Sequence, residues 1–153
     1  MTPHKQLFRH RPDDGSIGDC WRTTFACLLD LLPEEVPHFT EHCWNDTPKA
    51  NAAARAWLAT RGLGFVELAY QSGLDSVLAS VAACSPNTYY LLGGNSRTGV
   101  GHSVIALNDQ IVWDPSLDDT GITGPMDDGY YWVTWLVPSF LIKSPVAELE
   151  LAA

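Results

Sequence analysis

The sequence of 153 residues is short of positive charge, because 9 Lys and Arg residues stand against 18 Asp and Glu residues and leave a formal net charge of −9. It has no basic arm and no run of Lys or Arg. Nothing in it therefore neutralises the phosphates of a nucleic acid or an anionic lipid surface. We expect neither nucleic acid nor a membrane among its partners.

Long apolar runs and disulfide-rich spacing are missing as well. No apolar run approaches the roughly 20 residues that cross a bilayer, and the first residues lack the apolar stretch of a signal peptide. The four cysteines are too few and too scattered for a disulfide framework. These absences predict a cytoplasmic protein. A hydrophobic content of 46% and a charged content of 18% are typical of a globular domain.

The hydrophobic pattern changes along the chain from helical spacing to runs rich in branched and aromatic residues. An irregular strap over residues 1–18 is followed by predicted helices over 20–32 and 47–62, a short strand over 65–69 and a third helix after position 72. Further strands are predicted over residues 89–92, 102–107, 110–114 and 130–137, before a tail over 139–153 that holds a strand followed by disordered residues. The predicted N-caps are Asp19, Thr47 and Ser72. Helices first and an antiparallel sheet afterwards indicate a single α+β domain.

Three residues suited to nucleophilic catalysis fall at the ends of predicted elements. Cys20 begins the first helix, where the helix dipole favours the thiolate and free backbone N–H groups, including that of Cys20, can stabilise an oxyanion. His102 begins a strand after a glycine-rich loop, and Asp114 ends the next strand, where its carboxylate can orient the imidazole. Taken singly, each has an ordinary structural explanation. Their order along the chain favours a catalytic triad.

The spacing of His102 and Asp114 provides a geometric test of that triad. With a three-residue hairpin loop over residues 107–109, the two residues are direct cross-strand neighbours on one face, about 5 Å apart at Cβ. A two-residue loop instead places them on opposite faces, because a shift of one residue turns every side chain over. The predicted contact therefore depends on the length of the turn.

The order Cys, His, Asp resembles that of the papain-like cysteine peptidases. The compact double-glycine leader peptidases have a similar pair of strands, matched here by residues 101–105 (Gly-His-Ser-Val-Ile) and 111–115 (Ile-Val-Trp-Asp-Pro). The chain is also similar to small uncharacterised phage and prophage proteins, whose Gly-Asn/Asp-Cys, Leu-Leu-x-Leu and Glu-x-Val-Pro-His-Phe motifs match residues 18–20, 28–31 and 34–39. The resemblance covers most of residues 6–137. It implies a papain-like fold, in which an N-terminal helical half with a buried central helix packs on a C-terminal antiparallel sheet.

The same resemblance implies roles for individual residues: Cys20 as the nucleophile, His102 as the base, and Asp114 as the residue that orients the base. The family also places a Gln about six residues before the Cys, where its side-chain N–H helps to form the oxyanion hole. Position 14 is Asp here, and an ionised Asp cannot donate a hydrogen bond. Gln6, the only upstream Gln, is the candidate donor beside the Cys20 backbone amide. The alternative is a solvated residue of the strap.

Other reactive residues have simpler interpretations. Helical cysteines are usually small buried hydrophobes, so Cys27 and Cys84 are predicted core residues, and Cys43 a loop or core thiol. No Cys or His pair has zinc-ligand spacing, and we expect neither a metal nor a cofactor. The carboxylate of Asp19 opposes a neighbouring thiolate, and capping of the helix is its preferred role.

These features predict a cysteine peptidase-like thiol hydrolase. It acts on peptide, isopeptide or glutamine amide bonds of a protein or peptide substrate through a Cys-His-Asp triad and an acyl-enzyme. Peptidase, deamidase and acyltransferase chemistry stay open, as does the oligomeric state. The alternative is a non-catalytic phage or bacterial binding protein that retains the papain-like fold, and a structural subunit with a relic cleft is a third possibility.

Overall fold

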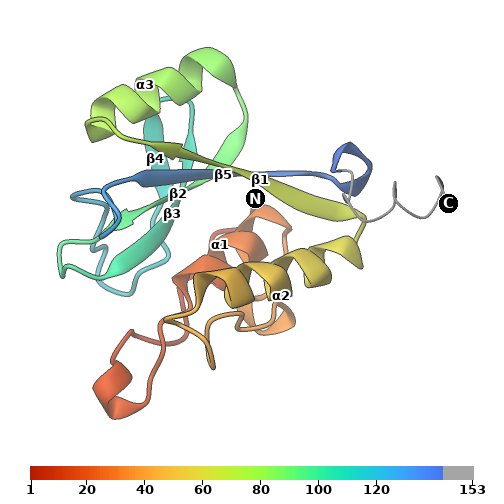
Figure 1. Ribbon diagram of the computed structural model, residues 1–153, viewed down its shortest axis with the longest axis vertical. Coiled ribbons are helices and arrows are strands. Elements are labelled where there is room, and N and C mark those ends of the chain that lie inside the picture. The colour runs from red at the N-terminus through yellow and green to blue at the C-terminus, as the bar shows by residue number, and fades with distance from the viewer. Residues whose placement is uncertain (143–153) are drawn as a thin grey trace, which may run out of the picture.

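The computed structural model describes residues 1–142, which form three α-helices and a five-stranded antiparallel sheet (Figure 1). The sheet lies between α1 (Cys20–Leu28) and α2 (Thr47–Ala59) on one side and α3 (Leu74–Cys84) on the other. The predicted α+β class is therefore confirmed. Residues 143–153 of the predicted tail lie outside the described residues.

Helix α1 is shorter than predicted, because it ends at Leu28. Asp30 then takes a positive φ of 54°, and the amide of Leu31 bonds back to the carbonyl of Ala26 at 2.9 Å. This left-handed turn closes the helix as a Schellman motif, in which Asp tolerates the positive φ better than a large apolar residue does. The helix is buried as predicted, with Phe25 fully shielded from solvent.

The N-caps of the other two helices differ from the prediction by one residue. Asp46, and not Thr47, caps α2, because its side chain accepts a hydrogen bond from the amide of Lys49. Helix α3 has Gly73 at its N-cap, so Ser72 does not cap it. Both helices begin one residue away from the expected place, because local hydrogen bonds decide where a helix begins.

The five strands run in the order β1-β5-β2-β3-β4, and every neighbouring pair is antiparallel. They are β1 (Leu63–Tyr70), β2 (Tyr89–Asn95), β3 (Gly101–Leu107), β4 (Gln110–Trp113) and β5 (Tyr131–Pro138). Each of the five overlaps a predicted strand, so the existence and the approximate position of every one of these strands are confirmed. The tail begins with the 3₁₀ turn η3 (Ser139–Leu141), where a strand had been expected. Because the last strand, β5, lies between β1 and β2, it joins the two halves of the chain.

Two apolar clusters hold the helices on the sheet. The cluster under α3 comprises Val77, Leu78, Val81, Tyr90, Leu92, Val104, Ala106, Ile122, Tyr131 and Val133. The cluster under α1 and α2 comprises Phe25, Ala26, Val36, Phe39, Ala54, Leu58, Phe65 and Leu91. Since close-packed interiors resist displacement, the start of α1 has a fixed position relative to the central strands.

The strap over residues 1–18 is irregular, as predicted, apart from the 3₁₀ turn η1 (Pro12–Asp14). Backbone hydrogen bonds join it to the end of α1, from the amide of Thr2 to the carbonyl of Cys27, and to the segment after β4. Just before Cys20 it passes very close to itself: a Cβ at Gly18 would lie 2.9 Å from the Cβ of His10. A residue without a side chain is therefore needed at the entrance to the helix.

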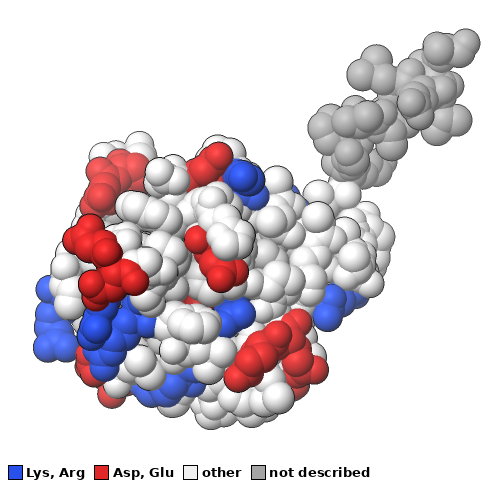
Figure 2. Space-filling view, turned by 90° about the horizontal axis from the view of Figure 1, so that it is seen from below, with Lys and Arg blue, Asp and Glu red and all other residues white. Residues whose placement is uncertain are grey.

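The surface of the described part agrees with some expectations and corrects one. Cys27 and Cys43 are buried, but Cys84 is exposed, because it is the last residue of α3 and the sheet no longer covers it. Among residues 1–142, no helix is both long enough and apolar enough to cross a membrane. On the face shown in Figure 2, acidic and basic side chains lie in small separate groups.

Candidate active site

Cys20 is the first residue of α1, as predicted, and its thiol is partly exposed. The backbone N–H groups of a first helical turn have no acceptor inside their own helix. No side chain caps this turn, since Asp19 occupies the N-cap position without a capping hydrogen bond. The sulfur and the amide of Cys20 therefore lie side by side at the free end of a buried helix.

The carboxylate of Asp19 binds the strap and not the helix, which corrects its predicted role. It accepts hydrogen bonds from the amides of Leu7 and Phe8 at 3.2 and 2.8 Å, and it pairs with Nε of Arg22 at 2.9 Å. Its side chain is fully buried, and Arg22 balances its charge. Asp19 therefore fixes the strap beside Cys20 without leaving an unpaired negative charge next to the thiol.

His102 on β3 and Asp114, just after β4, form the predicted contact. Nε2 of His102 lies 2.7 Å from Oδ1 of Asp114, and the same carboxylate accepts hydrogen bonds from the amides of Ser116 and Gly121 at 2.7 and 2.8 Å. Burial alone raises the pKa of Asp114. The hydrogen bond from His102, followed by those from the two amides, outweighs burial and holds the pKa well below its ordinary value. The carboxylate is therefore ionised and firmly oriented.

The turn between β3 and β4 is shorter than the three-residue loop that would pair His102 directly with Asp114. Leu107 pairs with Gln110, which leaves Asn108 and Asp109 as a two-residue loop, with Asn108 at a positive φ of 54°. Asn is one of the few residues that readily adopt this conformation. The three-residue loop is therefore wrong, and His102 and Asp114 are not directly paired.

A β-bulge restores the contact that the short turn alone would have broken. Val112 has no partner on β3, so Ile105 pairs with Trp113 one position later than regular pairing would allow. Because side chains alternate between the faces of a strand, this extra residue returns Asp114 to the face of His102. The two side chains meet diagonally across the hairpin.

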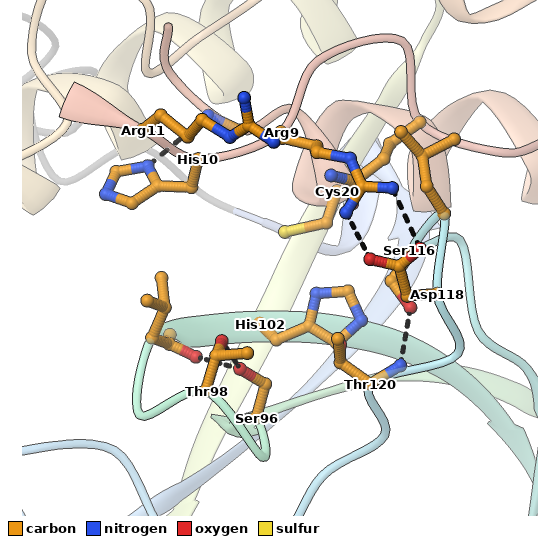
Figure 3. A pocket seen from close by; sticks show the side chains of 15 residues that line it. Arg9, His10, Arg11, Cys20, Ser96, Thr98, His102, Ser116, Asp118 and Thr120 are labelled. Carbon is orange, nitrogen blue, oxygen red and sulfur yellow. Dashed lines mark hydrogen bonds and ion pairs between the residues drawn. The ribbon is translucent and has the colours of Figure 1, made fainter. Parts of the chain in front are cut away.

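The thiol of Cys20 and the ring of His102 face each other across one pocket (Figure 3). Burial alone lowers the pKa of His102. Hydrogen bonds to Asp114 and to Cys20, together with the negative charges of both, outweigh burial and raise this pKa to about 9. Since Nε2 is bonded to Asp114, Nδ1 is the ring nitrogen left for the thiol proton. The ring of His102 therefore lies between an ionised carboxylate and the thiol of Cys20.

Gln6 lies in the same pocket, on the strap. Its side chain is 9% exposed, its Nε2 donates to the carbonyl of Phe8 at 2.7 Å, and its backbone N–H donates to the carbonyl of Pro115 at 2.8 Å. The alternative of a solvated strap residue is therefore wrong. A side-chain amide nitrogen carries two hydrogens, so one N–H remains beyond the bond to Phe8.

Several residues that hold the site were missed by sequence reasoning. Nζ of Lys5 donates to the carbonyls of Asp114 and Ser116 at 3.0 and 2.8 Å, and so joins the strap to the segment that carries the carboxylate. The Asp-Pro-Ser sequence at residues 114–116 is typical of an Asx turn, so the bond from the Ser116 amide could have been foreseen. No local pattern points to Lys5, which is 109 residues from Asp114, or to Gly121, which an irregular loop brings back to the carboxylate.

Cys20 and His102 lie where two hollows meet. The smaller arm, about 290 Å³, lies against the strap and the segment over residues 116–120. The larger arm, about 900 Å³, extends between the sheet and the start of α2. The residues that line both arms are His10, Gly18, Cys20, Val100, Gly101 and His102. The cleft therefore runs past the thiol in two directions.

In residues 1–142, no group of three or more His, Cys, Asp or Glu side chains is placed to hold a metal ion. Comparison of the chain with described protein families, with curated proteins and with solved structures gave no match. The chemistry of the site is therefore inferred from its own geometry.

Proposed function

We propose that the protein is a thiol hydrolase with a papain-like arrangement of Cys20, His102 and Asp114. It hydrolyses peptide, isopeptide or glutamine amide bonds through an acyl-enzyme. The observation that carries the proposal is the double contact of His102, which bonds to Asp114 through Nε2 and faces the thiol of Cys20. A purely structural role for His102 would explain its bond to Asp114, but it would not explain the partly exposed thiol on the other side of the ring.

In the first half of the reaction, the Cys20 thiolate attacks the carbonyl carbon and the carbonyl oxygen becomes an oxyanion. In this proposal the amide of Cys20 and the remaining N–H of Gln6 are the donors that stabilise it. The tetrahedral intermediate then collapses, and the C–N bond breaks as the imidazolium of His102 gives its proton to the leaving amine. The products are a thioester on Cys20 and a free amine.

In the second half, His102 accepts a proton from water as the water oxygen attacks the thioester. Collapse of this intermediate breaks the C–S bond, releases a carboxylic acid and restores the pair of Cys20 and His102. Asp114 keeps the ring in one orientation through both halves, because its carboxylate is itself held by two backbone amides.

The shape of the cleft supports a chain-like substrate. Because hollows extend from Cys20 in two directions, a polypeptide can continue on both sides of the attacked carbonyl. Hydrolysis of a peptide or isopeptide bond uses both arms, whereas deamidation of a glutamine side chain uses the second arm for ammonia alone. Peptide and isopeptide bonds are therefore the preferred substrates in this proposal.

The test is the rate at which iodoacetamide alkylates each cysteine at pH 6, measured by mass spectrometry of tryptic peptides. Cys84 is an internal standard, because it is exposed on α3, away from the pocket. We expect Cys20 to react at least ten times faster than Cys84, and His102→Gln to remove that difference. His42→Gln changes an exposed histidine outside the pocket and is the matched control. Equal rates for Cys20 and Cys84 in the unchanged protein would falsify the proposal.

A further inference from the structure

The floor of the larger arm is formed by side chains on neighbouring strands of the sheet. Glu67 on β1 pairs with Thr134 on β5, which pairs with Leu91 on β2. Two residues further along these strands, Gly93 pairs with Trp132. Because Gly93 has no side chain, the space above it in the arm stays open. The arm therefore reaches from His102 across three strands to a carboxylate.

Three carboxylates line this arm, and no Lys or Arg does. Each accepts a hydrogen bond from an uncharged donor: Glu67 from the Thr134 hydroxyl, Asp127 from the Asn95 side chain, and Asp128 from the indole of Trp132. Among residues 1–142 none of the three carboxylates has an ion-pair partner. The formal charge of these three carboxylates is −3, and no Lys or Arg in the walls of the arm balances it.

Glu67 is the inner member of the three, since Asp127 and Asp128 are exposed at the rim. Burial raises the pKa of Glu67, while the bond from Thr134 and the charge of Arg55 act in the opposite direction without cancelling it. A carboxylate that is partly buried without full compensation gains when a cation enters beside it.

Aromatic walls complete the environment. Trp44 and Trp132 both line the arm, and the indole of Trp44 is about half exposed. Indole faces attract guanidinium and ammonium groups, and they also pack against the aliphatic stems of Arg and Lys. The lining therefore suits a long cationic side chain better than a free carboxylate or a small polar group.

The smaller arm has the opposite sign. Its Arg and Asp side chains are Arg9, Arg11 and Asp118, two cations against one anion, and Arg9 forms a bidentate pair with Asp118. A cationic substrate group is therefore repelled from one arm and attracted to the other. This difference orients a polypeptide relative to Cys20.

On the basis of the function proposed above, we propose that the larger arm binds a Lys or Arg side chain of the substrate polypeptide, between Glu67 and the two tryptophans. Strands lie about 4.8 Å apart, so β1 lies about 14 Å from β3. The charged substrate residue is thus separated from the bond that is cut, and it selects the substrate without entering the reaction.

The experiment measures binding, so that it does not depend on turnover. The Cys20→Ala protein is titrated into fluorescein-labelled dodecapeptides of Gly, Ser, Ala and Leu that contain one Arg, or citrulline at the same place, and anisotropy gives Kd. Citrulline has the shape of Arg without the charge. We expect the Arg peptide to bind at least ten times more tightly, with the difference reduced about tenfold by 0.5 M NaCl.

Two variants in the same background show whether the cleft is responsible. Glu67→Gln combined with Asp127→Asn and Asp128→Asn is expected to reduce the Arg preference below threefold. Glu34→Gln removes an exposed charge outside the cleft and is expected to leave the preference unchanged. Equal binding of the two peptides, no binding of the Arg peptide, or a preference that the triple variant retains would each overturn the inference.

The alkylation test keeps this inference separate from the proposed function. Fast labelling of Cys20 together with equal peptide binding refutes the charged substrate and retains the hydrolase. Slow labelling together with a cleft-dependent Arg preference refutes the hydrolase and leaves a groove for cationic polypeptide segments.

Discussion

His102 and Asp114 meet diagonally across a bulged hairpin, with Nε2 2.7 Å from Oδ1, although neither residue is the other's cross-strand partner. The carboxylate of Asp114 is held by three hydrogen bonds, because the amides of Ser116 and Gly121 bind it in addition to the ring of His102. A side chain bound in this way loses little freedom when a substrate arrives. The orientation of His102 is therefore fixed by the fold itself, as the proposed hydrolase requires.

Replacing Asp114 by Asn removes the charge that raises the pKa of His102, and its single side-chain oxygen leaves one of the two amides without an acceptor. We expect kcat/KM to fall about 10³-fold, because the imidazolium loses its stabilising anion. The alkaline limb of the pH profile, expected near pH 9 in the unchanged protein, moves to lower pH. Peptide hydrolysis measured from pH 5 to 10 provides both quantities. Asp109→Asn, in the turn of the same hairpin, is the control, and a limb that stays near pH 9 in Asp114→Asn contradicts the assignment.

The pKa of His102 also predicts how stability depends on pH. In the folded protein this pKa is about 9, above the ordinary 6.5, so protonation of His102 stabilises the fold. The contribution is complete below about pH 6.5 and is lost as the pH rises through 9. At about 1.4 kcal/mol per pKa unit, it amounts to about 3–4 kcal/mol at most. Urea unfolding at pH 6 and pH 10 measures the loss.

The matching variants for this measurement are His102→Gln and His42→Gln. Since Gln does not titrate, His102→Gln is expected to show a much smaller loss of unfolding free energy between the two pH values. His42 is 87% exposed, and its replacement should leave the pH dependence as it was. The same loss in His102→Gln and the unchanged protein would show that other groups cause it.

Gln6→Ala tests the second oxyanion donor. We expect kcat to fall about 10²-fold while KM stays nearly constant, because the donor acts on charge that develops only in the transition state. Loss of the bond to Phe8 is expected to change stability by only about 1 kcal/mol. Gln71→Ala, exposed between β1 and α3, is the control. A variant with lower stability but full kcat would assign Gln6 to the strap alone.

The buried pair of Asp19 and Arg22 is expected to be essential for the strap. Asp19→Ala leaves Arg22 and two amides without their acceptor, and we expect a loss of about 3–5 kcal/mol in urea unfolding. Asp13→Ala, on the exposed turn η1, should change stability by less than about 0.5 kcal/mol. If the two variants are equally stable, the pair does not hold the strap.

The elements of the fold were largely predictable from the sequence, and their ends were not. Helical spacing and strand alternation are local signals, and they located every α-helix and strand of the described chain, although not its 3₁₀ helices. The end of α1 and the cap of α2 were missed because single bonds decide them. At Asp30 the backbone turns left-handed, and at Asp46 a carboxylate captures a helix amide.

The order of residues already shows which reactive groups exist and where each lies: a thiol at the start of a helix, an imidazole on a strand and a carboxylate at the end of the next strand. That these groups meet follows only from how the chain packs. The two-residue turn alone would place Asp114 on the face opposite His102. The bulge at Val112 returns Asp114 to the same face, so the contact needs both features. Gln6 and Glu67 reach the cleft through contacts with distant segments. Periodicity arises from neighbours in the chain, whereas a site forms from residues that packing brings together, so the spacing of residues cannot specify it.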